Sequence, residues 1–381
     1  MLRIVCRTRP TALQIEPRMF AGLQTPRNQG WIKPMQKRSA SRLLLIATFV
    51  ALTIANGAEP RLDSRRLTIL ERELAKLQRK HDIPGMSGAI AAGKEIVWLK
   101  AFGKADQERD IPVTTNTVFH LASLTKPFAA AILLQLVESG KLDLDTPASK
   151  FGIAFTNSPS ITVRHLLSHT SEGEPGTAYK YSGARFRHLD KVIEALTGNN
   201  FATEVGQRIG EPLHLNDTAP NPEVPAACRA AGRLPEPFKA RLAKGYQPNG
   251  KVPQAYPQGV SASAGLVSTA ADIARFSIAW DENTLLKPET KALAYTAGRS
   301  KDGTPLAYGL GWFIFEKDRR KVVWHYGWWD GISALIVKAP QQKLTFVLLA
   351  NSDMLSRPFN LGGDSDVHRS AFASAFLKSL E

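Results

Sequence analysis

The chain carries His120-Leu121-Ala122-Ser123-Leu124-Thr125-Lys126-Pro127, in which a serine hydroxyl and a lysine amine lie three residues apart, directly before an apolar segment. Residues i and i+3 of a helix share one face, so the amine can reach the hydroxyl. Pro127 is tolerated only in the first turn of a helix. It therefore places Ser123 at the N-terminal end of the helix, where free N–H groups favour negative charge.

The S-x-x-K spacing of Ser123 and Lys126 is that of serine acyl-transfer enzymes. An oxyanion formed when Ser123 attacks a carbonyl would find a backbone donor at the start of the helix. The same two residues would also fit a serine N-cap followed by a solvated lysine. The rest of the chain decides between these two interpretations.

Two further stretches favour the catalytic interpretation. One combines Ser160-Ile161-Thr162-Val163-Arg164-His165-Leu166-Leu167-Ser168-His169-Thr170-Ser171 with Pro175-Gly176-Thr177-Ala178-Tyr179-Lys180-Tyr181-Ser182, and the other is Trp324-His325-Tyr326-Gly327-Trp328-Trp329-Asp330-Gly331. With the S-x-x-K run they resemble the three motifs of the β-lactamase-related serine hydrolases, which include class C β-lactamases, DD-peptidases and esterases. The resemblance extends from about Ile83 to Asn351, with the motifs in the family's order.

The resemblance implies an α/β (α+β) fold, with an antiparallel sheet flanked by helices and an inserted, mainly helical domain, as in β-lactamases and transpeptidases. The residue patterns agree with this fold. They predict an amphipathic helix at 63–82, a hairpin at 86–102, a buried helix after Ser123 and a final helix at 366–380. Closely spaced strands of an antiparallel meander are predicted at 308–315, 321–325, 332–338 and 343–350. The helical lobe is expected at about 140–255, within a catalytic domain covering 58–381.

The resemblance also implies the members of the site. Ser123 is the expected nucleophile, and Lys126 or Tyr181 is the expected base, because a serine hydroxyl needs a proton acceptor. We expect His325, Gly327 and Trp328 in substrate binding or in the oxyanion hole, with the backbone N–H of Trp328 as a donor beside that of Ser123. The aromatic residues of this third motif either line an apolar acyl site or serve in packing; they are Trp324, Tyr326, Trp328 and Trp329.

The second motif departs from the family. Its pattern is Y-x-N, and this chain has Tyr181-Ser182-Gly183. In the family the asparagine donates to the acyl amide of the substrate, so its absence puts efficient turnover of peptide-like substrates in doubt. His325 stands where many relatives carry lysine. A histidine is mostly neutral at pH 7 and offers no fixed charge to a substrate carboxylate, which points away from penicillins.

The N-terminal residues indicate export. Lys37, Arg38 and Arg42 precede an uncharged apolar run from Leu43 to Ala55, so 35–57 is predicted to be a secretory signal peptide. Residues 1–34 are a dispensable extension or precede a true start at Met35. We expect a periplasmic or secreted protein, with membrane association only if the signal segment stays uncleaved.

Composition excludes other classes of function. Most of the formal charge of +15 falls in residues 1–58, and no basic helix or zinc-ligand pattern follows, so no nucleic-acid partner is expected. His165 and His169 are four residues apart but lack a third ligand, so no metal is expected, and no cofactor. The predicted function is an exported serine hydrolase acting through a Ser123 acyl-enzyme, on an ester in preference to a D-amino-acid or β-lactam-type amide. The alternative is a catalytically weak protein of the same fold that binds peptidoglycan or penicillin.

Overall fold

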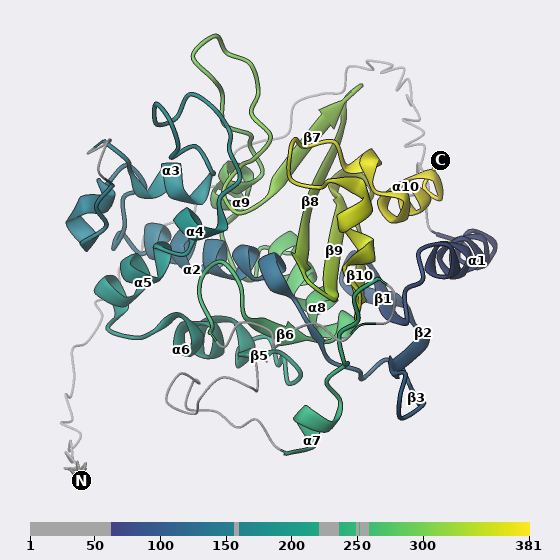
Figure 1. The fold of residues 1–381 in the computed structure, drawn as a ribbon. Helices are drawn as coiled ribbons and strands as arrows, with labels where there is room; N and C mark the ends of the chain where they lie inside the picture. Colours follow the sequence, from purple (N-terminus) through teal and green to yellow (C-terminus); the bar gives the residue numbers. More distant parts are fainter. Residues whose placement is uncertain (1–61, 156–159, 221–235, 249–250, 252–258) are drawn as a thin grey trace, which may run out of the picture. The chain divides into compact units, whose positions relative to one another are not determined.

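The structure, a computed structural model, describes residues 62–155, 160–220, 236–248, 251 and 259–381. In these residues the largest sheet has seven antiparallel strands in the order β3-β2-β1-β10-β9-β8-β7 (Figure 1). The strands are β1 (Gly85–Ala92), β2 (Glu95–Asp106), β3 (Ile111–Pro112), β7 (Phe313–Lys317), β8 (Arg320–Trp329), β9 (Ile332–Ala339) and β10 (Leu344–Ala350). Since β1 pairs with β10, in a register that opposes Met86 to Ala350, both ends of the described chain build one sheet. The predicted fold class is confirmed.

The helices lie on both faces of this sheet and beside it. They are α1 (Ser64–Lys80), α2 (Lys126–Glu138), α3 (Val163–Leu167), α4 (Gly183–Phe186), α5 (Leu189–Thr197), α6 (Phe201–Val205), α7 (Glu236–Ala240), α8 (Ala270–Asp281), α9 (Pro288–Ala294) and α10 (Ala371–Lys378). The predicted final helix is shorter than expected, because a 3-10 turn precedes Ser370, the N-cap of α10. The predicted strand at 308–315 starts late, at Phe313, after Gly309 and Gly311 interrupt the run.

Alternating residues of the central strands face two separate cores. On β10, Phe346 and Leu348 belong to the core that α1 and α10 cover, whereas Val347 and Leu349 belong to the core that α2 and α8 cover. Figure 1 shows α8 and α10 on opposite sides of the sheet. Both faces of the sheet are therefore buried, which explains the nearly continuous apolar sequence of β9 and β10.

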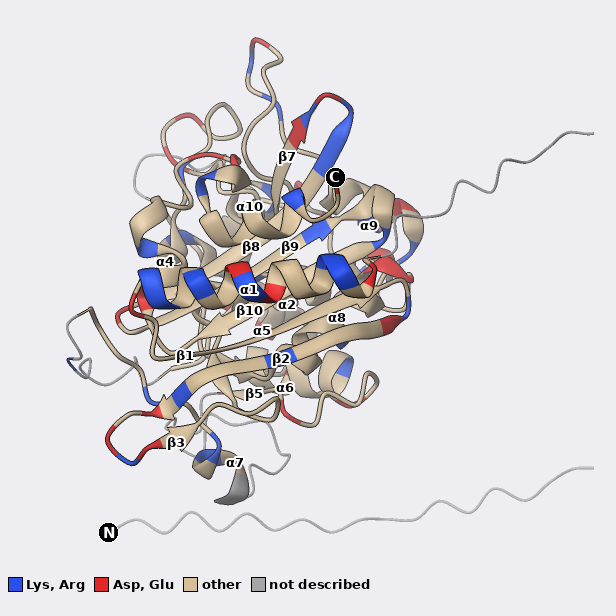
Figure 2. Ribbon diagram, turned by 90° about the vertical axis from the view of Figure 1, so that its right-hand side faces the viewer, with Lys and Arg blue, Asp and Glu red and all other residues tan. Residues whose placement is uncertain are grey.

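Helix α1 matches its sequence pattern closely. The Asp63 carboxylate accepts from the N–H of Arg66 at 2.8 Å and caps the helix, while Leu70, Leu74 and Leu77 are buried. Figure 2 shows α1 lying across the sheet with basic and acidic residues along its length.

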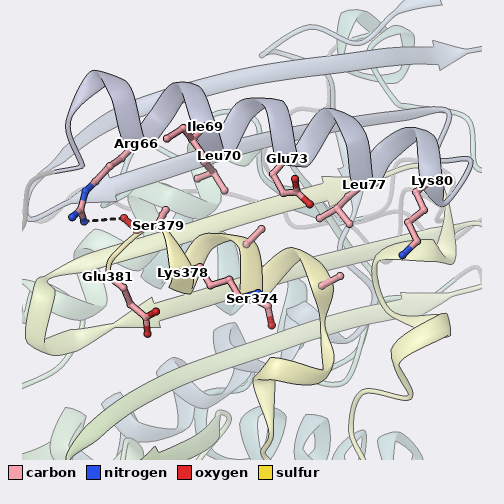
Figure 3. Close-up of a pocket in the computed structure, with 12 residues that line it drawn as sticks. Arg66, Ile69, Leu70, Glu73, Leu77, Lys80, Ser374, Lys378, Ser379 and Glu381 are labelled. Carbon is pink, nitrogen blue, oxygen red and sulfur yellow. Dashed lines mark hydrogen bonds between the residues drawn. The ribbon is translucent and has the colours of Figure 1, made fainter.

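A groove of about 560 Å³ separates α1 from α10 and is closed at one end by Arg66, which donates to the carbonyl of Ser379 (Figure 3). Its lining comes from the residues of α1 and the C-terminal segment 371–381. The groove therefore does not include the predicted reactive residues.

A small second sheet supports the S-x-x-K segment. It has the order β4-β6-β5, where β4 is Phe119–His120, β5 is Ala219–Pro220 and β6 is Leu266–Ser268. Strand β4 leads directly into the 3-10 turn η1 (Ala122–Thr125), and α2 follows at once. Helix α2 is buried along nearly its whole length, as its apolar sequence predicts, so it holds this segment inside the protein.

The region predicted to form the helical lobe contains α3, α4, α5, α6 and α7 in its described parts. The predicted extension at 1–34 and signal peptide at 35–57 lie outside the described residues. Among the residues that are described, no helix has the length and apolar content needed to cross a bilayer.

Candidate active site

The segment that carries Ser123 is held in a strained backbone conformation. Ala122 has a φ of 45°, an unfavourable value for a residue with a side chain. The N–H of Leu121 donates to the carbonyl of Leu266 at 2.9 Å, which ties the segment to β6. Ser123 is half-buried and follows immediately, one turn before α2. Strain of this kind persists only where the surrounding structure fixes it, and it is common at functional sites.

Lys126 and Ser123 are in direct contact. The Lys126 Nζ lies 2.8 Å from the Ser123 Oγ, and the amine also donates to the backbone carbonyl of Ser263 at 3.0 Å. The lysine side chain is fully buried, and burial lowers its pKa to about 7. With this pKa the amine is about half neutral at pH 7, and its neutral form can accept a proton from a neighbouring hydroxyl.

Tyr181 lies beside the same amine. The Lys126 Nζ is 4.9 Å from the centre of the Tyr181 ring. The Tyr181 hydroxyl is buried without a hydrogen-bond partner among the described residues. Burial, together with Tyr326, raises the pKa of Tyr181 well above its usual value, while the nearby Ser123 hydroxyl opposes the rise. In this environment the phenol is protonated, so it can donate a proton but is a poor first base.

His169 forms the back of the site. Its ring lies 4.3 Å from that of Tyr181, centre to centre, and its Nδ1 accepts from the N–H of Ser182 at 3.2 Å. Burial and the Lys126 charge hold the pKa of His169 well below its usual value, so the ring is neutral. His165, its neighbour in the motif, instead caps α3 by accepting from the N–H of Thr162. The two histidines thus have separate structural partners.

His325 is placed differently from our prediction. Its side chain is fully buried, and Nδ1 lies 2.7 Å from the carbonyl of Tyr326, which can only accept, so Nδ1 carries the proton. Nε2 then accepts from the Tyr308 hydroxyl at 2.8 Å. Burial and the Lys126 charge hold the pKa of His325 well below its usual value. Both ring nitrogens of His325 are hydrogen-bonded within the protein, and its ring lies 6.4 Å from that of Tyr181, centre to centre. His325 therefore packs near Tyr181 and has no free ring nitrogen for a substrate.

Gly327 allows β8 to approach the segment that carries Ser123. A Cβ placed on Gly327 would lie 2.0 Å from the carbonyl oxygen of Leu121, so no other residue fits here without displacing that segment. Trp328 follows at the exposed end of β8, with 46% of its surface accessible. Trp324 is fully buried against Phe313 and donates to the Ser365 carbonyl, so it serves in packing and not in an acyl site.

A cavity of about 360 Å³ opens at this end of β8. Tyr326 connects it to the site, because the Tyr326 ring lies 5.8 Å from that of Tyr181. The lining residues are mixed in character and come from the end of β8 and the segment after β10; they are Tyr326, Trp328, Asp330, Ser356, Arg357, Asn360 and Leu361. Ser123, Lys126 and Tyr181 are not among the residues that line this cavity.

The described ranges hold no cluster of three His, Cys, Asp or Glu side chains arranged as metal ligands.

The comparisons with known proteins agree with this geometry. The family model described as Beta-lactamase matches residues 70–364. The chain belongs to the β-lactamase family. It is similar to penicillin-binding protein 4* of Bacillus subtilis (strain 168), with 25% identity over 330 residues that cover 73% of this chain and 70% of that protein. It is also similar to esterase EstB of Burkholderia gladioli, with 29% identity over 299 residues that cover 61% of this chain and 74% of the esterase.

Solved structures show the same fold. The octameric penicillin-binding protein homologue from Pyrococcus abyssi superposes with a TM-score of 0.68 at 23% identity, covering 82% of this chain and 77% of the homologue. At this identity the likeness supports the fold alone. The prediction of a β-lactamase-related serine hydrolase is confirmed at the level of the family, whose known members here include both an esterase and penicillin-binding proteins.

The departure from the family's second motif falls inside the site. Gly183 begins α4, and a Cβ placed on it would lie 3.9 Å from the Lys126 Nζ, an ordinary contact distance. The position that carries asparagine in the family pattern therefore faces the Lys126 amine, and in this chain it carries no side chain.

Sequence reasoning missed three contributors to the site. They are the ring of His169, the backbone carbonyl of Ser263, and Asp190, whose carboxylate accepts from the N–H of Ala262. Ser263 and Lys126 are 137 residues apart in the chain. No local pattern points to such a contact, although Ser263 lies within the extent of the resemblance, from about Ile83 to Asn351.

Proposed function

We propose that the protein hydrolyses an ester through a covalent acyl-enzyme formed on Ser123, with Lys126 as the general base. The observation that carries this proposal is the fully buried Lys126 amine, 2.8 Å from the Ser123 hydroxyl, with a pKa near 7. A general base is most effective when its pKa lies near the working pH. The neutral amine takes the proton of the Ser123 hydroxyl as the oxygen attacks the substrate carbonyl.

Tyr181 takes the second role in this proposal. Its raised pKa keeps the hydroxyl protonated. The hydroxyl is buried near Ser123 and has no hydrogen-bond partner among the described residues. It is therefore suited to donate its proton to the leaving oxygen. Lys126, which holds the proton taken from Ser123, then returns a proton to the Tyr181 oxygen. Release of the alcohol leaves the acyl-enzyme, and water activated by the same base completes hydrolysis.

The oxyanion of the tetrahedral intermediate would be stabilised by backbone donors. We assign this role to the N–H groups of Ser123 and Trp328, as the family resemblance implies. The close approach of β8 to the nucleophile segment at Gly327 supports the assignment, because it brings the two backbones together. Preorganised donors of this kind are commonly worth about 10²–10³ in rate.

The ester preference rests on two residues. Gly183 has no amide to pair with an acylamide group, and the ring nitrogens of His325 are already bonded to Tyr308 and Tyr326. Each substrate polar group left unpaired in a buried site costs about 1–3 kcal/mol. A simple ester needs neither contact. Similarity to esterase EstB is consistent with this preference.

Export is part of the proposal and rests on the sequence of 35–57 alone. N-terminal sequencing of the mature protein, expressed with residues 1–57 in a host with a secretion system, tests it. Cleavage close to Gly57 supports export, and an N-terminus within residues 1–34 in mature protein contradicts it.

The function is tested by incubating the protein with a fluorophosphonate, a penicillin and a panel of short-chain activated esters, followed by intact-mass analysis and rate measurement. We expect one adduct, on Ser123, and higher kcat/KM for an ester than for any lactam or D-Ala-D-Ala peptide. Labelling that persists in Ser123→Ala contradicts the nucleophile. A stable penicillin adduct without turnover of any ester instead supports the weak penicillin-binding alternative.

A further inference from the structure

Lys126 is held from two sides, and only one of them belongs to the S-x-x-K segment. The second partner of its amine is the backbone carbonyl of Ser263, at 3.0 Å. A neutral amine has two protons and one lone pair. When one proton is bound by the Ser263 carbonyl, the rotation of the amine is restricted and its lone pair can be kept toward Ser123.

Ser263 lies in a short, tightly closed loop, 259–265. Ser261 and Ala264 exchange two backbone hydrogen bonds, at 2.8 and 3.1 Å. Gly265 has a φ of 113°, and a Cβ on it would lie 2.4 Å from the carbonyl oxygen of Gly259. The loop is therefore closed on itself, and a contact that fixes one of its residues also restrains the Ser263 carbonyl.

One side chain from another element fixes this loop. Asp190, in the first turn of α5, accepts from the backbone N–H of Ala262 at 2.6 Å. Ala262 is fully buried and is the immediate neighbour of Ser263. Asp190 and Ala262 are 72 residues apart in the chain, so the bond joins the α5 segment to the loop that holds the lysine.

Resting on the proposed function of Ser123 and Lys126, we propose that Asp190 is a positioning residue: its carboxylate anchors the 259–265 loop, and the Ser263 carbonyl of that loop holds the Lys126 amine against Ser123. Asp190 touches no reacting atom in this arrangement. Its contribution is to keep the amine buried and oriented, and misplacing a catalytic group by about 1 Å can cost about 10²-fold in rate.

The titratable groups around both residues are consistent with this role. Burial raises the pKa of Asp190 to about 6, against the hydrogen bond from the Ala262 N–H and the charge of Arg187, which lower it, while Glu194 raises it; the carboxylate is therefore mostly ionised at pH 7. On the lysine side, the neighbouring His169 and His325 are neutral, since burial keeps the pKa of each well below its usual value. Burial is the cause of the lowered Lys126 pKa, so opening of the loop that let water reach the amine would raise this pKa.

The test measures the Lys126 pKa directly, by NMR titration of protein labelled with ε-¹³C-lysine, with the signal assigned by its loss in Lys126→Met. We expect the wild type to titrate near pH 7. In Asp190→Ala the loop loosens, water reaches the amine, and the Lys126 pKa rises toward the ordinary lysine value. Asp190→Asn keeps an acceptor oxygen for the Ala262 N–H, so it should restore the wild-type pKa.

Two further variants serve as controls. Glu289 is an exposed acid in the first turn of α9, and Glu289→Ala should leave the Lys126 pKa unchanged. This control separates anchoring of the 259–265 loop by Asp190 from a general effect of removing a charge at a helix N-terminus. If Asp190→Ala does not fold, Asp190→Leu provides a side chain of similar size without an acceptor. A Lys126 pKa that stays near 7 in the folded Ala or Leu variant overturns the proposal.

The rate of Ser123 labelling by a fluorophosphonate completes the test. We expect it to fall about 10²-fold in Asp190→Ala and to recover in Asp190→Asn. If the pKa shifts but wild-type Ser123 is not labelled at all, the proposed function fails and the positioning role stands. If Ser123 is labelled at the same rate in every Asp190 variant and the pKa does not move, the positioning role fails and the proposed function stands.

Discussion

Gly183 faces the amine of Lys126, at a distance where an added Cβ would just contact that amine. A Cβ added at Gly183 would meet the Lys126 Nζ at 3.9 Å and no other atom within 4 Å, and the Gly183 backbone is acceptable to any residue. The site thus carries no side chain where the family pattern has a hydrogen-bonding amide, and a Cβ fits there without a clash.

Gly183→Asn should raise kcat/KM for amide or lactam acylation relative to ester acylation. One added hydrogen bond is worth about 0.5–1.5 kcal/mol, so the ratio should rise up to about tenfold. Stopped-flow acylation with a cephalosporin and a matched ester measures it. Gly183→Ala is the control, since it fills part of the space without a donor. An equal effect of Ala and Asn would show that the missing amide is not what limits amide substrates.

Lys126→Met should abolish most of the activity and stabilise the fold at neutral pH. The folded pKa of Lys126 is about 7 and the unfolded pKa about 10.4, so between these values the unfolded state binds more protons. The destabilisation of the folded state by burial of the protonated lysine is complete below pH 7 and disappears above pH 10.4. Methionine carries no such penalty.

The free energy of unfolding of Lys126→Met should therefore exceed that of the wild type most strongly at pH 6, by a few kcal/mol, and this difference should shrink steadily toward pH 10. Urea unfolding at several pH values measures it. A difference that does not vary with pH would mean that the lysine is not buried as a neutral amine.

Tyr181→Phe should separate catalysis from stability. The Tyr181 hydroxyl is buried without a hydrogen-bond partner among the described residues, so its removal should leave the free energy of unfolding unchanged or raise it. Acylation should nevertheless slow by about 10²–10⁴, the usual value of general acid–base catalysis. Near-wild-type acylation in this variant would remove Tyr181 from the mechanism.

Gly327→Ala should damage both fold and activity, because the new methyl group would lie 2.0 Å from the Leu121 carbonyl oxygen. Overpacking of this kind costs about 1–3 kcal/mol, and here it also displaces the segment that carries Ser123. Gly363→Ala is the matched control, since a Cβ at exposed Gly363 meets nothing within 4 Å. Thermal unfolding and fluorophosphonate labelling of both variants measure the effect; equal behaviour of the two would contradict it.

Much of the fold could be predicted from the sequence, because the decisive signals are local. The cap at Asp63, the apolar periodicity of α1 and the continuous apolar run of α2 each act within a few residues. The S-x-x-K contact is equally local, since Ser123 and Lys126 are three residues apart. The family resemblance supplied Tyr181, which no local pattern connects to them.

The remaining features depend on contacts between distant parts of the chain. The orientation of His325 could not be predicted, because its partner Tyr308 lies on another segment. The alternation of a strand shows which residues face the core, but not which of them form a hydrogen bond there. Asp190 likewise looks like an ordinary acid at a helix N-terminus. Only the fold brings it to the Ala262 N–H and, through Ser263, to Lys126.

The pH dependence of Ser123 labelling by a fluorophosphonate tests the central claim most directly, because it reports the nucleophile and its base in one experiment. The labelling rate of the wild type should rise with pH and reach half its maximum near pH 7, the pKa of buried Lys126, and Lys126→Met should lose this rise. A midpoint near pH 10, as expected for an exposed lysine, or an adduct on a residue other than Ser123 would contradict the account.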